Sequence, residues 1–130
     1  MLRSGVQFHW INAGYANFDD FLATFTHDKR KKIRQERRKV SEAGVRFRAL
    51  PGEQMAEADW DFFYRCYERT YLEHGNAPYL TRDFFARMAQ EMPQHWVMFV
   101  GERQGQPIAC SLVAVSEAGA GGVAYGRYWG

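Results

Sequence analysis

The residues that most clearly offer chemistry form a basic run, in which eight of the eleven side chains from Lys29 to Lys39 are Lys or Arg. Like charges four residues apart on a helix repel each other by roughly a few tenths of a kcal/mol per pair, so this clustering opposes helix stability. On a helix, Arg30, Arg34 and Arg37 share a face that suits the phosphates of a nucleotide, CoA or tRNA. A solvated helix that neutralises acidic residues elsewhere explains the run equally well, and both interpretations stay open.

A second candidate is the aromatic and basic segment Gly126–Gly130, which we expect to lie on a strand. Glycine permits close approach of the backbone, and aromatic rings pack against flat ligands, so this strand is able to line a groove. An ordinary buried strand is the alternative. The sequence does not separate these two interpretations.

Other polar residues have simpler explanations. The histidines His9, His27, His74 and His95 show no metal-ligand spacing, so we expect no metal site, and His9 is best interpreted as a hydrogen-bonded structural residue. Six acidic residues fall in the first turns of predicted helices, where the helix dipole favours negative charge: Asp19, Asp20, Glu57, Asp59, Asp61 and Asp83. The loop Ser116–Gly122 joins two predicted strands, which favours a hairpin loop over a phosphate-binding loop.

Composition indicates one well-packed soluble domain, or a large piece of one: of 130 residues, 46% are apolar and 25% are charged. Cys66 and Cys110 fit no metal spacing, so we interpret them as reduced core thiols of a cytoplasmic protein. The net charge of +2 hides an asymmetry. Residues 1–50 carry 11 basic against 5 acidic side chains, whereas residues 51–130 carry 6 against 10. A local positive field suggests an anionic partner.

Hydrophobic spacing predicts helices interleaved with strands. Predicted helices follow the caps Asn17 and Thr81 and span Asp28–Glu42 and Ala58–Glu73; predicted strands span Val6–Trp10, Val45–Ala49, Trp96–Arg103, Pro107–Val115 and Val123–Trp129. The last three strands, joined by short loops, predict an antiparallel meander. Helices that precede an antiparallel sheet indicate an α+β fold.

Several segments together resemble the FemAB-like family of bacterial proteins, described as peptidoglycan biosynthesis or recognition proteins. The matching stretches are Phe8–Trp10, Tyr15–Leu22, Lys29–Arg38, Pro78–Phe85 and Gly126–Gly130. They occur in order over nearly the whole chain, which makes the resemblance more specific than a single short motif.

The resemblance implies a partial fold of the GNAT (acyl-CoA N-acyltransferase) superfamily, with helices packed on an antiparallel meander. Residues 1–52 would then be the tail of a preceding GNAT-like domain, or a connector with a basic helix. Residues 53–130 would be the first part of a GNAT-like domain. The GNAT pyrophosphate loop does not occur in the sequence. We therefore expect the chain to be a fragment, inactive by itself.

The activity that the resemblance implies is transfer of an acyl or aminoacyl group to an amine, for example that of a peptidoglycan precursor. An acyl-CoA or aminoacyl-tRNA donor would serve as substrate, with no covalently bound cofactor. We expect a small anionic substrate as partner, with tRNA and a homodimer through an exposed strand edge as further partners, and no membrane. The alternative is a non-catalytic module that recognises anionic cell-wall precursors or RNA through its basic helix.

Transfer of this kind requires a bound donor, a polarised carbonyl group and a base for the attacking amine. The sequence does not identify the base, so catalytic residues stay unknown. The predicted binding residues are Lys31, Arg34 and Arg37 for anionic groups, and Tyr125, Arg127, Tyr128 and Trp129 for the lining of a cleft.

Overall fold

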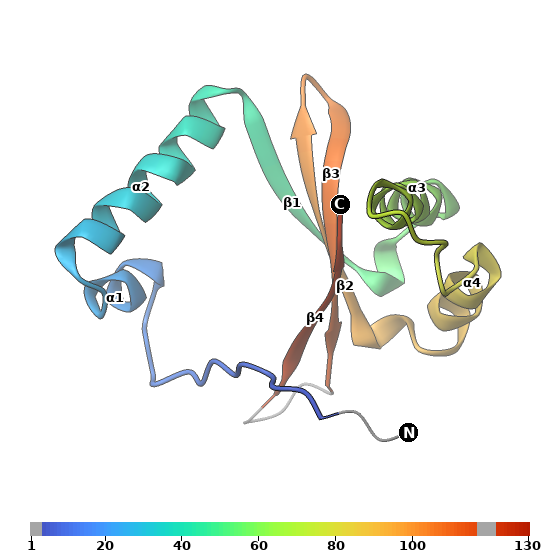
Figure 1. The fold of residues 1–130 in the computed structure, drawn as a ribbon, viewed down its shortest axis with the longest axis horizontal. Helices are drawn as coiled ribbons and strands as arrows, with labels where there is room; N and C mark the ends of the chain where they lie inside the picture. The colour runs from blue at the N-terminus through green and yellow to red at the C-terminus, as the bar shows by residue number, and fades with distance from the viewer. Residues whose placement is uncertain (1–3, 117–121) are drawn as a thin grey trace. The chain divides into compact units, whose positions relative to one another are not determined.

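The computed structural model describes residues 4–116 and 122–130 (Figure 1). The chain divides into two compact units, Met1–Val40 and Ser41–Gly130, which are described separately below. The expected boundary near residue 52, which refers to domains of the family, stays a prediction. The loop predicted for Ser116–Gly122 falls largely on residues 117–121, outside the described residues.

The first unit contains α1 (Phe18–Ala23) and most of α2 (His27–Glu42). The predicted cap is confirmed, because the Asn17 side chain accepts a hydrogen bond of 2.9 Å from the backbone N–H of Asp20. The strand predicted for Val6–Trp10 is wrong, since these residues belong to no strand and Phe8 is 97% exposed. Alternation of side chains cannot create a strand without a neighbour that completes the backbone hydrogen bonds.

The second unit is built on a four-stranded antiparallel sheet with the order β1-β2-β3-β4. Its strands are β1 (Val45–Pro51), β2 (Trp96–Arg103), β3 (Gln106–Val115) and β4 (Ala124–Trp129). The predicted meander of β2, β3 and β4 is confirmed. In addition, β1 pairs with β2 and extends the sheet, a partner that its sequence does not reveal. Strands β1 and β4 are therefore its two edges.

Two helices pack on one face of this sheet, α3 (Glu57–Glu73) and α4 (Arg82–Glu91), and Figure 1 shows both on the same side. Short 3₁₀ turns, Gly52–Gln54 and Pro93–His95, connect them to the strands on either side. Arg82 ties the helices together, because its guanidinium lies 2.7 Å from Glu57 and 2.8 Å from Asp61. The predicted α+β class is confirmed, and the arrangement is consistent with a partial GNAT-like fold.

Aromatic rings fill the layer between the helices and the sheet. Phe85 of α4 is fully buried, and its ring centroid lies 4.9 Å from that of Phe63 on α3. Tyr67 and Tyr128 approach the same ring from α3 and β4, at 5.4 and 5.8 Å. Met98, Val100 and Leu112 close the layer from the sheet side. Phe85 therefore joins both helices and the edge strand β4 in one core.

We predict that Phe85→Ala lowers the free energy of unfolding by about 3–5 kcal/mol, because it opens a cavity at the centre of this layer. The matched control is Phe84→Ala at the neighbouring position, where the ring is 38% exposed and the expected loss is about 1 kcal/mol. Urea denaturation followed by circular dichroism measures both. If Phe85→Ala does not fold, Phe85→Leu should still lose more stability than Phe84→Leu. Equal losses in both pairs would contradict this role of Phe85.

Candidate functional site

The C-terminal end of α3 is locked into a Schellman motif that holds two polar side chains in place. Gly75 has a φ of +72°, a left-handed conformation that glycine adopts without strain. The N–H of Gly75 donates to Leu72 O, and the N–H of Asn76 donates to Tyr71 O, both at 3.0 Å. His74 and Asn76 therefore occupy fixed positions on either side of Gly75.

One of these side chains, His74, has a defined tautomer in its neutral form. Its Nδ1 lies 2.7 Å from the carbonyl oxygen of Thr70, one helical turn earlier. A carbonyl oxygen only accepts hydrogen bonds, so Nδ1 must carry the proton. The lone pair of the neutral ring is then on Nε2. The Asn76 side chain donates to the His74 carbonyl at 3.1 Å and reinforces the same turn. His74 can therefore accept a proton at Nε2.

Opposite this helix end, a β-bulge redirects the edge strand β4. Leu112 of β3 pairs with Tyr128, but the next residue, Val113, pairs with Gly126. Arg127 is the extra residue that this change of register leaves without a partner on β3. Its guanidinium carbon lies 5.6 Å from the centre of the Tyr128 ring, and no ion pair with a carboxylate is found for it within residues 4–116 and 122–130. The bulge therefore places the Arg127 guanidinium beside the ring of Tyr128.

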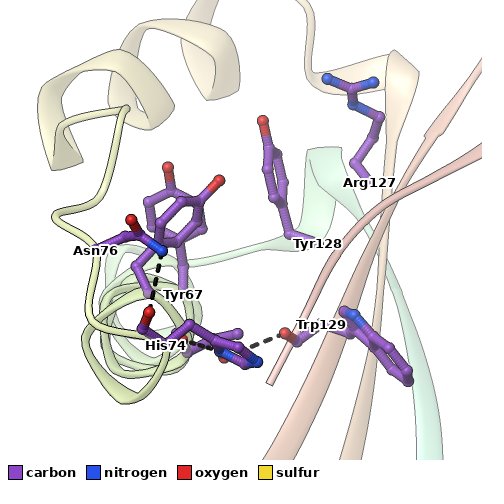
Figure 2. Close-up of a pocket in the computed structure, with 8 residues that line it drawn as sticks. Tyr67, His74, Asn76, Arg127, Tyr128 and Trp129 are labelled. Atoms are coloured by element: carbon purple, nitrogen blue, oxygen red, sulfur yellow. Dashed lines mark hydrogen bonds between the residues drawn. The ribbon is translucent and has the colours of Figure 1, made fainter. Parts of the chain in front are cut away.

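The end of β4 is seated directly on α3, which sets the distance between strand and helix. A Cβ atom on Gly130 would lie 2.8 Å from both Cys66 O and Thr70 Oγ1, too close for any other residue without a shift. The Thr70 hydroxyl lies 2.9 Å from Cys66 O and 3.4 Å from the Trp129 carbonyl. Figure 2 shows this carbonyl turned toward the helix. Strand and helix are thus joined by close packing rather than by a flexible contact.

Helix end and strand together enclose a groove of about 390 Å³ (Figure 2). Its lining comes from α3, the turn after it and β4: Tyr67, Thr70, Tyr71, His74, Asn76, Arg127, Tyr128 and Trp129. The groove combines a proton acceptor, an amide, a guanidinium and aromatic rings. Such a lining suits a polar ligand that has both an anionic group and a flat or ring-shaped part.

The aromatic wall of the groove is continuous with the core. Tyr67 is buried, and its ring lies 4.8 Å from that of Tyr71 and 5.1 Å from that of Tyr128. Burial, together with the hydrogen bond to Tyr67, raises the pKa of Tyr71. Tyr71 is therefore a neutral phenol near pH 7, whose hydroxyl oxygen can accept a hydrogen bond from a ligand.

The sequence-predicted residues of β4 are only partly brought together here. Arg127, Tyr128 and Trp129 all line the groove, whereas Tyr125 lies on the same strand, 53% exposed, and is not part of the lining. Tyr128 also packs against Phe85, so the groove and the buried-strand interpretations both apply to it. Trp129 lines the groove and is 80% exposed, so the buried-strand interpretation does not apply to it.

The sequence-predicted arginines of the basic helix lie in the first unit, where they make contacts with α1. Arg34 forms an ion pair of 3.2 Å with Asp19, and the Arg37 guanidinium lies 4.4 Å above the ring of Phe18. Arg30 donates to the carbonyl oxygens of Ala23 and Phe25, near the end of α1, at 3.3 and 3.2 Å. These three arginines therefore hold α1 against α2, in addition to any role in binding.

A second hollow of about 320 Å³ lies along α2. It is lined by His27, Arg30, Lys31, Arg34, Gln35 and Arg38. Lys31, the remaining predicted residue, is exposed in this lining. No carboxylate contributes to the lining, so the hollow presents a concentrated positive charge.

A third hollow, of about 540 Å³, reaches the sheet face opposite α3 and α4. Phe47, Phe99 and Trp129 are among its lining residues, and all three are substantially exposed. It is adjacent to the groove, since Thr70 and His74 line both. Its lining is mostly apolar, and the side chains in it that could take part in chemistry are those of Thr70, His74, Cys110 and Ser111.

Sequence reasoning missed the groove residues contributed by α3 and the turn after it: Tyr67, Thr70, Tyr71, His74 and Asn76. The helical spacing of Tyr67 and Tyr71 predicts core positions for both. Tyr67 is buried as predicted, whereas Tyr71 is only partly buried. A local signal did exist for His74 and Asn76. Gly75 predicts a left-handed helix end, and the residues on either side of such a glycine are held rigidly.

Two further classes of site find no support in the described part of the chain. Residues 4–116 and 122–130 contain no group of three or more His, Cys, Asp or Glu side chains that would hold a metal ion. Within the same residues, no helix is both long enough and apolar enough to cross a bilayer.

Comparison with known proteins identifies the family. No curated protein matches the chain at a significant level. A family model described as FemAB-like, peptidoglycan biosynthesis/recognition, matches residues 1–130, the full length of the sequence. This agrees with the resemblance carried by segments that include Pro78–Phe85 and Gly126–Gly130, and the chain belongs to the FemAB-like family of peptidoglycan biosynthesis or recognition proteins.

Proposed function

We propose that the chain is the substrate-binding part of an N-acyltransferase that adds an acyl or aminoacyl group to an amine of a peptidoglycan precursor. The observation that carries this proposal is the groove between the end of α3 and β4, which His74 and Arg127 both line, and the neutral His74 ring has its proton-accepting lone pair on Nε2. Family membership supports a peptidoglycan-related substrate.

The chemistry requires few groups from the protein. The amine nitrogen attacks the carbonyl carbon of a CoA thioester or a tRNA ester, and the bond from that carbon to the leaving sulfur or oxygen breaks. The amine loses one proton in this step, and His74 Nε2 is the group that would accept it. The leaving group takes up a proton from solvent. His74 is thus a candidate for the base that the sequence does not identify.

The groove also favours a particular class of acceptor. Peptidoglycan precursors combine sugar rings with a peptide that carries carboxylates. Sugar rings pack against aromatic faces, which Tyr71 and Tyr128 offer, and a carboxylate pairs with a guanidinium such as that of Arg127. The hydroxyl oxygen of Tyr71 and the side-chain amide of Asn76 add further hydrogen-bonding groups. The lining therefore suits the acceptor better than it suits a purely apolar ligand.

We predict that muramyl tripeptide with a free lysine amine binds the 130-residue chain, and that Arg127→Ala weakens binding about tenfold. Loss of one charge-assisted hydrogen bond, about 1.4 kcal/mol, is the physical reason. The matched control is Arg103→Ala, which removes an exposed arginine of the same sheet outside the groove lining. Isothermal titration calorimetry measures all three proteins. No binding to the unmodified chain, or equal losses in both variants, would contradict the proposal.

A second function, recognition of anionic ligands by α2 without catalysis, is supported by the basic hollow on that helix. Five of its six lining residues are Arg, Lys or His, and none is acidic. Lys31 is the residue to test, because Arg30 and Arg34 are already engaged by α1. The ligand class would be phosphate-bearing, with RNA as the natural probe.

For this function we predict that a short RNA hairpin binds in a salt-sensitive way. In a plot of the logarithm of the binding constant against the logarithm of the salt concentration, Lys31→Ala should reduce the magnitude of the slope by roughly one unit. Lys29→Ala removes the same charge from an exposed position outside the hollow and should change the slope less. Fluorescence anisotropy over a salt series measures both slopes. Identical slopes for the two variants would show nonspecific attraction to the helix and would exclude the hollow as a site.

A further inference from the structure

The two cysteines of the chain meet around Gly130 in the fold, although 44 positions separate them in the sequence. Cys66 is on α3 and packs against the core cluster that contains Cys110 of β3, and each thiol shifts the pKa of the other. Both are free thiols; Cys110 is buried, with 6% exposure, whereas Cys66 is half-buried. A reagent from solvent therefore reaches Cys66 more readily than Cys110.

The surroundings of the two sulfur atoms make them chemically unequal. The hydrogen bond from Cys110 and the charges of Arg65 and Arg69 lower the pKa of the Cys66 thiol. The same hydrogen bond, together with burial, raises the pKa of Cys110. The thiolate is the reactive form of cysteine, so Cys66 is the nucleophile of the pair. An accessible thiolate beside a second thiol is the arrangement found in redox-sensitive cysteine pairs.

Backbone contacts independently connect the two cysteines through Gly130. The N–H of Gly130 donates to Cys110 O at 3.0 Å, and the N–H of Cys110 donates to Gly130 O at 2.8 Å. On its other side, Gly130 packs against Cys66 O so closely that a Cβ atom there would lie 2.8 Å from it. The backbones of Cys66 on α3 and Cys110 on β3 thus meet on two sides of the same glycine.

We propose that Cys66 and Cys110 form a reversible dithiol–disulfide site that links α3 to β3. The proposal does not depend on acyl transfer, because it concerns only these two thiols and an external disulfide oxidant such as glutathione disulfide. Its position matters for the groove, since Gly130 and Thr70, which seat β4 on α3, both contact Cys66.

The reaction proceeds in two exchange steps. The Cys66 thiolate attacks one sulfur of glutathione disulfide, which forms a mixed disulfide and releases one glutathione thiolate. Cys110 then attacks the Cys66 sulfur, which forms the bond between the two cysteines and releases a second glutathione thiolate. The proton of Cys110 passes to the departing thiolate, and the first glutathione thiolate takes a proton from water. Two protein thiols are oxidised, and one glutathione disulfide is reduced to two glutathione molecules.

Intact mass spectrometry of the native 130-residue chain in glutathione buffers of graded redox poise tests the site. The unmodified chain should convert from two free thiols to none, with a loss of two hydrogens and no retained glutathione, and dithiothreitol should restore both thiols. Cys110→Ser should instead stop with one glutathione attached to Cys66. Cys66→Ser should leave Cys110 unreacted until the chain is denatured.

A second measurement tests whether oxidation of the cysteines changes the structure next to the groove. In ¹⁵N-labelled protein, oxidation should shift the amide resonances of Trp129 and Gly130, whereas the same buffer should leave those resonances unchanged in Cys66→Ser. An unmodified chain that keeps two free thiols in the most oxidising buffer, or that retains glutathione on Cys66 as its end product, would overturn the proposal. Neither result would affect binding of muramyl tripeptide, so the two proposals fail separately.

Discussion

The packing of α3 across β3 and β4 is the constraint on which both the fold and the groove depend. One face of this helix presents Phe63 and Tyr67 to the core, then Thr70 and His74 at its end, at the three- and four-residue spacing of a helix face. Phe63 and Tyr67 are covered by α4 and the sheet, whereas Thr70 and His74 extend past that cover. The groove is therefore the place where the core-facing side of one helix becomes accessible to solvent.

Elements with local signals could be predicted from the sequence. Asn17 and Thr81 cap their helices through side-chain hydrogen bonds that involve residues only three positions away. Gln104 and Gly105, both with positive φ, close the β2–β3 hairpin in the same local way. Pairing between distant segments was beyond this reasoning. Nothing near Val45–Pro51 indicates that its partner is β2, and nothing near Val6–Trp10 shows that a partner is lacking within its unit.

The same difference between local signals and distant contacts explains which residues of the groove could be predicted. Arg127 was recognised because it stands between aromatic residues on a strand, but the residue across the groove, His74, is 53 positions earlier in the sequence. A search for spaced histidines looks for metal ligands and cannot detect a single histidine held at a helix end. The basic run of Lys29–Lys39 was recognised as a candidate site, but its contacts within the fold could not be predicted. Its charge pattern predicts a binding face, yet the pattern cannot show that Arg30, Arg34 and Arg37 contact α1.

Gly130 shows how tightly groove and core are coupled. It lies between Cys66 on α3 and Cys110 on β3, and its neighbour Trp129 contributes both a groove surface and the carbonyl that Thr70 approaches. Close-packed interfaces of this kind do not deform smoothly, so a small change in the spacing of α3 and β3 must move β4 as a whole. Arg127 would then move relative to His74, because one is fixed to the strand and the other to the helix end. The width of the groove therefore depends on the packing of α3 against β3 and β4 in the core, more than on the side chains that line the groove.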